Sequence, residues 1–121
     1  MKVDPKFAAT FEGYFDPNFD DLSHHEWVEV MDRYIVHGLH PGGFFTSLLA
    51  NNMMNAMGSC HQLNPVKAIK SLCVWVQNSC PSEAWGSYDK VAAWCKLTQE
   101  ERRIILEKHN LVTTVWDILN E

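Results

Sequence analysis

Several features that define whole classes of protein are missing from this chain of 121 residues. No apolar run approaches the roughly 20 residues that a bilayer-spanning helix needs, and the start, Met1-Lys-Val-Asp-Pro-Lys6, leads into no apolar segment of a secretion signal. The chain has no Cys-x-x-Cys pair, no Gly-x-Ser-x-Gly elbow and no glycine-rich phosphate loop. We therefore expect a cytoplasmic protein that is not an enzyme, does not bind membranes and needs no metal or cofactor.

Sustained alternation of apolar and polar residues is also lacking, so strands have little support. A chain of this length is typical of one domain, and it can bury roughly two-thirds of its unfolded surface. We expect a single all-α domain, a compact bundle of five or six short helices over residues 23–121. Residues 1–22 are expected to form an irregular, acidic arm. Its aromatic side chains would hold it on the helical body or on a partner: Phe7, Phe11, Tyr14, Phe15 and Phe19.

Capping signals predict where the helices begin and end. Ser23-His-His-Glu26 and Thr98-Gln-Glu-Glu101 both match the capping box, in which the first side chain accepts from an early backbone N–H. Pro41 and Gly58 bracket one apolar stripe, which predicts a single helix between them. Helices are also expected to end at a left-handed Gly38, before Pro81 and at a left-handed Asn110. Further helices are expected to start at the caps Asn64-Pro65 and Ser87, and a last helical segment is expected from Val112 to Leu119.

Cysteines and histidines form no recognisable ligand or nucleophile pattern. The four cysteines have spacings that fit no structural zinc site, and we expect reduced thiols packed as small apolar groups. His37 and His40 flank a predicted helix end, and Cys60 adjoins His61. Whether these four side chains converge is left open, but residues adjacent in sequence seldom form a nucleophile–base pair. The cysteines are Cys60, Cys73, Cys80 and Cys95.

Negative charge is concentrated at the N-terminal end. The formal net charge is −5, and residues 1–32 hold eight of the 15 acidic residues but only two of the 10 lysines and arginines. This end would repel a phosphate backbone, which disfavours direct binding of nucleic acid. It predicts either a solvated segment or a partner-binding surface. In the second case the binding residues are Glu12, Asp16, Asp20, Asp21 and Glu29, with Trp85 as an aromatic anchor; otherwise Trp85 plugs the bundle.

Polar groups in the middle of the chain offer a second candidate site. Gly42 and Gly43 open a helix and leave backbone N–H groups that could hold an anion, unless they only permit a tight turn. Asn51 and Asn55 are four residues apart, with Asn52 between them, and on one helix the two would share a face. These amides either organise the bundle or bind a ligand. The next predicted helix is apolar nearly all round, so it is central in a monomer or packed in a homodimer.

The motif Gly38-Leu-His-Pro-Gly-Gly-Phe44, followed by Trp85-Gly-Ser87, resembles a group of small uncharacterised proteins from bacteriophages and prophages. The resemblance covers roughly residues 28–95, and Asn51-Asn52 stands where that group has an Asn-Asp pair. It implies a phage origin and brings no activity.

Together with the acidic surface, this resemblance predicts a non-enzymatic viral protein that binds a bacterial host protein complex. In the version that inhibits, the target is an antiviral defence nuclease of the CRISPR type. One alternative is a small-ligand-binding or enzymatic module that uses the turn 41–44 and the face of Asn51, Asn52 and Asn55. The other is a homo-oligomeric structural protein.

Overall fold

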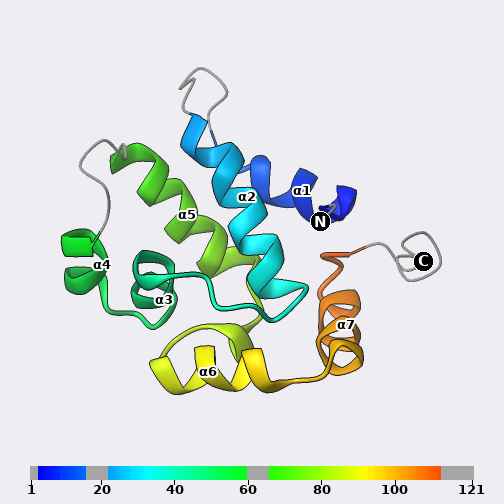
Figure 1. Ribbon diagram of the computed structural model, residues 1–121. Helices are drawn as coiled ribbons and strands as arrows, with labels where there is room; N and C mark the ends of the chain where they lie inside the picture. The colour runs from blue at the N-terminus through cyan, green and yellow to red at the C-terminus, as the bar shows by residue number, and fades with distance from the viewer. Residues whose placement is uncertain (1–2, 16–21, 60–65, 113–121) are drawn as a thin grey trace.

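A computed structural model describes residues 3–15, 22–59 and 66–112 of the chain (Figure 1). These residues form helices and no strand, which confirms the all-α class. None of their helices is both long and apolar enough to cross a membrane. Seven α-helices and one short 3-10 helix are present in the described ranges: α1 Pro5–Glu12, α2 Leu22–Ile35, α3 Gly43–Leu49, α4 Met53–Ser59, α5 Val66–Ser79, η1 Ser82–Ala84, α6 Tyr88–Lys96 and α7 Gln99–Lys108.

The N-terminal arm is not irregular, because residues 5–12 form α1. Asp4 caps this helix: its carboxylate accepts from the backbone N–H of Lys6 at 2.9 Å and of Phe7 at 3.3 Å. Pro5 stands at the first helical position, where its missing N–H costs nothing. Phe7 and Phe11 are four residues apart and fully buried. The aromatic residues therefore dock the arm onto the body of the protein.

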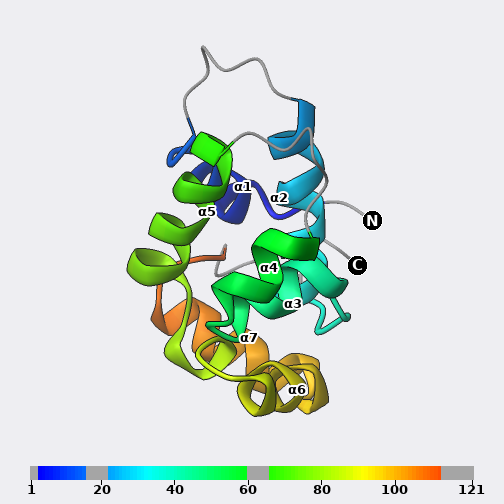
Figure 2. The ribbon, with the colours of Figure 1, turned by 90° about the vertical axis from the view of Figure 1, so that its left-hand side faces the viewer.

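The body that receives α1 is built from α2 and α5, which lie beside it in both views (Figures 1 and 2). Trp75 of α5 is fully buried and meets both α1 phenylalanines edge-on, with ring centroids 5.8 Å from Phe7 and 4.9 Å from Phe11. At least one apolar face of α5 is thus covered by the chain's own N-terminus, in agreement with a central position. Residues 16–21 and 113–121, which include Phe19 and all but the first residue of the last predicted helical segment, lie outside the described ranges.

The predicted helix over residues 41–58 is two helices. α3 ends at Leu49, and Asn51 takes a left-handed conformation with φ +64°, which asparagine tolerates better than most residues. Asn52 then starts α4: its side-chain oxygen accepts from the backbone N–H of Asn55 at 3.2 Å. This break and α1 account for the helices beyond the expected five or six.

Most other boundaries agree with the capping signals. Thr98 and Glu101 form the reciprocal capping box of α7, and Ser87 caps α6. Gly38 and Asn110 are left-handed, with φ +71° and +62°, and α5 ends at Ser79, before Pro81. Ser23 is not the cap of α2, because the described part of this helix already includes Leu22 before it. Residues 60–65, with the predicted cap Asn64-Pro65, are outside the described ranges.

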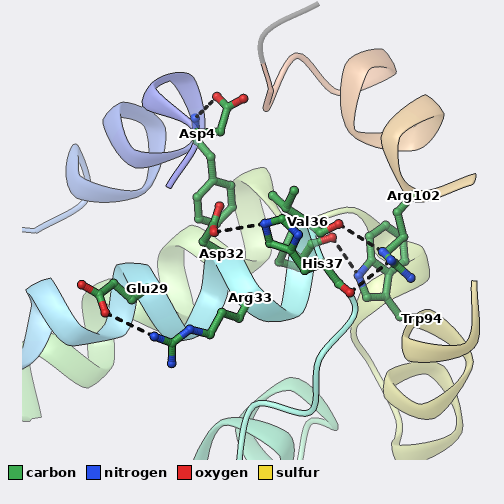
Figure 3. Close-up of polar contacts among 10 residues, drawn as sticks. Asp4, Glu29, Asp32, Arg33, Val36, His37, Trp94 and Arg102 are labelled. Atoms are coloured by element: carbon green, nitrogen blue, oxygen red, sulfur yellow. Dashed lines mark hydrogen bonds and ion pairs between the residues drawn. The ribbon is translucent and has the colours of Figure 1, made fainter. Parts of the chain in front are cut away.

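Two side chains from the C-terminal helices satisfy the end of α2 (Figure 3). The indole N–H of Trp94 lies 3.1 Å from the carbonyl oxygens of both Tyr34 and Ile35. The guanidinium of Arg102 donates to the next two carbonyls, of Val36 at 3.2 Å and of His37 at 3.1 Å, and also to Leu97. The last carbonyls of a helix lack partners within it, so these contacts fix α6 and α7 against α2.

Candidate functional site

Polar side chains from three segments meet at Tyr88, the first residue of α6. The Nδ2 of Asn52 donates to the Tyr88 hydroxyl at 3.0 Å, and the Ser47 hydroxyl of α3 lies 3.3 Å from the same oxygen. Asn55 in turn donates to Ser47 at 2.6 Å. Hydrogen bonds from Ser47 first, and then from Asn52, lower the pKa of the Tyr88 phenol because they stabilise its ionised form.

A groove with a volume of about 420 Å³ opens beside this cluster. One side of α6 forms a wall of this groove, where Tyr88, Val91, Ala92 and Cys95 recur at helical spacing. Tyr88 and Ala92 are exposed, whereas Val91 is buried. The other wall carries His40 and Thr46. The His40 ring is held at both nitrogens, since Nδ1 accepts from the Gly42 N–H at 3.1 Å and Nε2 lies 3.3 Å from the Thr46 hydroxyl. Lys96 completes the lining.

Only part of the predicted polar face exists. Asn52 and Asn55 are brought together, and their side chains donate to Tyr88 and Ser47. Asn55 is exposed and Asn52 is half-exposed. Asn51 does not share a helical face with Asn55, because the chain turns left-handed at Asn51. Gly42 and Gly43 are exposed at the start of α3, and the Gly42 N–H is used by His40.

The second candidate region is an apolar surface, which we call the α4 surface. It consists of Met53, Met54 and Met57, all exposed, with Met54 87% exposed. Below it, a notch of about 70 Å³ is lined by Met53, by Trp85 and by residues of α3 and α5. Trp85 is half-buried and packs against the core, so it both plugs the bundle and presents part of its ring at the notch.

The structure describes only some of the residues of the predicted acidic surface. Glu12 and Glu29 are exposed, and Glu29 lies 3.6 Å from Arg33, one turn further along α2 (Figure 3). Such an exposed ion pair contributes little to stability. Asp16, Asp20 and Asp21 lie outside the described residues.

His37 and His40 have different neighbours. His37 Nε2 lies 3.7 Å from an Asp32 carboxylate oxygen, whereas His40 faces Thr46. Burial lowers the pKa of His37, with the Arg102 charge as the second cause. No group of three His, Cys, Asp or Glu that could hold a metal ion occurs within the described ranges, and Cys60 and His61 lie outside them.

The described cysteines are free thiols: Cys73, Cys80 and Cys95. Burial raises the pKa of all three, which keeps them protonated and poorly reactive.

A buried pair of carboxylates, Asp4 and Asp32, lies where α1 meets α2 (Figure 3). Asp32 is 1% exposed, and its Oδ1 has no hydrogen-bond partner among the described residues. Burial is the main reason that the pKa of Asp32 is raised to about 6; the Asp4 charge adds to the effect, while a hydrogen bond from the Asp4 backbone opposes it. The sequence contained no local signal for this pair.

Comparison of the chain with protein-family models, with curated protein sequences and with solved structures gives no match. The resemblance to phage and prophage proteins therefore stays a prediction.

Proposed function

We propose that this protein acts without catalysis, by binding another protein through the α4 surface. The observation that carries the proposal is the exposure of three methionines on one short helix, above a notch that contains a tryptophan ring. Contiguous exposed apolar side chains commonly mark interaction sites in soluble proteins. Methionine adapts its shape to a partner, and a half-buried tryptophan is a frequent energetic anchor.

We further propose that the partner is a bacterial protein complex, as the phage-type resemblance suggests. The charge of the chain supports a partner with basic groups beside an apolar contact: the net charge is −5, and Glu12 and Glu29 are exposed. A defence nuclease has basic channels for nucleic acid, and an acidic protein complements such a channel by charge.

The test is a pull-down from bacterial lysate with three forms of the protein. Met54→Asp places a charge in the α4 surface at a residue that is 87% exposed, so the fold is not disturbed. Ile104→Asp is the matched control, because Ile104 is also apolar and 58% exposed but lies on α7. We expect one stoichiometric partner with the wild-type protein and the control, and its loss with Met54→Asp. Equal capture by all three forms would refute the role of the α4 surface.

Salt separates the two contributions to binding. Apolar contacts are little affected by added salt, whereas Coulombic attraction between exposed charges is screened. We expect salt to slow association and to weaken binding partially. Complete release by salt, with no effect of Met54→Asp, would instead assign binding to the acidic residues alone.

A further inference from the structure

We infer that α1 is a strap whose attachment to α2 and α5 loosens when Asp32 ionises, so that the pH sets how often this N-terminal helix opens. The inference does not depend on the proposed function. Asp32 lies where α1 meets α2, is 1% exposed, and has an Oδ1 with no hydrogen-bond partner among the described residues. A buried carboxylate that lacks full pairing is costly in its charged form, and the cost falls when the carboxylate is protonated or reached by water.

Asp32 contacts α1 at the residue that starts this helix. The backbone of Asp4 hydrogen-bonds the Asp32 carboxylate. The Asp4 side chain, itself 2% exposed, caps α1 through the N–H groups of Lys6 and Phe7 (Figure 3). Burial first, and then the nearby Asp4 charge, raise the pKa of Asp32. The docked position of α1 therefore favours the protonated form of Asp32.

Three further charged or titratable groups act on this contact. Arg33 of α2 and the N-terminal amino group lower the pKa of Asp32, but burial outweighs them and the pKa stays at about 6. His37, which follows the end of α2, has its Nε2 3.7 Å from an Asp32 oxygen. Burial lowers the pKa of His37, so protonation of His37 favours opening at low pH and opposes the effect of Asp32. A test must therefore compare proteins with and without the Asp32 carboxyl group.

Other contacts of α1 do not change with pH in the range where Asp32 titrates. Phe7 and Phe11 are fully buried against Trp75, and the Tyr14 hydroxyl lies 2.8 Å from that of Ser79. These contacts keep α1 docked most of the time, while Asp32 adjusts how firmly. A helix of eight residues is marginal on its own, so α1 unfolds when it leaves the body. Opening then uncovers the ring of Trp75 on α5.

Amide hydrogen exchange, followed by mass spectrometry of peptides from α1 and α6, measures this opening. The exchange rate of a helix, divided by the rate of the same unfolded peptide, gives the fraction of time that the helix is open. We expect α1 to be open more often than α6 at every pH. The pKa of Asp32 is about 6 in the docked state against an ordinary 3.8. Between about pH 4.5 and about pH 7.5, ionisation of Asp32 should therefore raise the open fraction of α1 by about 25-fold.

Variants assign the rise to Asp32. Asp32→Asn keeps an oxygen for the Asp4 backbone but cannot ionise, so its α1 should lack this 25-fold rise. Asp89→Asn, at an exposed position on α6, is the matched control and should behave as wild type. Asp4→Asn keeps a capping oxygen and removes the neighbouring charge, so the rise should be smaller than in the wild-type protein.

Three results would overturn the inference. The first is an equal rise in the wild-type protein and in Asp32→Asn. The second is an undiminished rise in Asp4→Asn, which keeps the test decisive even if Asp32→Asn folds poorly. The third is an open fraction of α1 equal to that of α6 in the wild-type protein, because α1 would then open only when the whole protein unfolds.

Discussion

Replacing Asp32 by asparagine should change how the stability of this protein depends on pH. Asp32 is almost fully buried between α1 and α2. The charged and polar groups near it are Asp4, which caps α1, Arg33 on α2, and His37, which follows the end of α2. In the folded protein the pKa of Asp32 is about 6, against an ordinary value of 3.8. A raised pKa means that folding favours the protonated acid, so this group makes the fold less stable as pH rises.

The magnitude follows from the two pKa values. Their difference corresponds to a loss of about 3 kcal/mol of unfolding free energy when Asp32 is fully ionised. This loss begins as the pH rises past the pKa of the unfolded chain, and it is complete once the pH is well above the pKa in the folded protein. Between about pH 4.5 and about pH 7.5, the wild-type protein should lose about 2 kcal/mol of unfolding free energy through Asp32. An asparagine side chain cannot ionise, so the Asp32→Asn variant lacks this loss.

Urea unfolding at both pH values measures the effect. Other carboxyl groups, such as Glu101 with its lowered pKa, contribute slopes of opposite sign. We therefore compare how much the unfolding free energy changes between the two pH values in the wild-type protein and in the Asp32→Asn variant, and take the difference. Asp89→Asn, at an exposed position on α6, is the matched control and should behave as wild type. If Asp32→Asn shows the same pH dependence as the wild-type protein, Asp32 ionises in the fold without penalty and the reasoning fails.

Two further predictions concern the end of α2. Gly38→Ala should destabilise the protein by about 2 kcal/mol or more in thermal unfolding, because φ is +71° and an added Cβ would meet the guanidinium of Arg102. Gly43→Ala is the control: its Cβ would meet no atom within 4 Å, so it should have no such cost. Arg102→Lys should cost about 2–3 kcal/mol in urea unfolding, since an ammonium group cannot reach three carbonyls at once. Arg33→Lys, which alters only an exposed ion pair, should cost less than about 0.5 kcal/mol, and an equal cost for both lysine variants would contradict the assigned role of Arg102.

Local signals in the sequence predicted the local parts of the fold. The caps at Ser87 and Thr98, and the left-handed turns at Gly38 and Asn110, depend on neighbours a few residues away. Asp4-Pro5 is the same kind of signal, a capping side chain followed by a first-turn proline, but the aromatic residues around it are equally typical of an irregular arm docked on a helical body.

The candidate site could not be predicted, because its contacts join distant parts of the chain. Ser47 and Tyr88 are 41 residues apart, and Asn52 and Tyr88 are 36 apart. No spacing rule links such pairs. The cluster of asparagines did mark the region, but only the left-handed turn at Asn51 decides which amides reach Tyr88.

The central claim is that the α4 surface binds a protein partner, and site-specific photo-crosslinking tests it most directly. A photoreactive phenylalanine analogue would replace Met54 in one form of the protein and Ile104 in another, and each form would be irradiated in bacterial cells. The account predicts one covalent partner of defined mass from position 54 and none from position 104. A partner captured only at position 104, or no adduct at position 54, would contradict it.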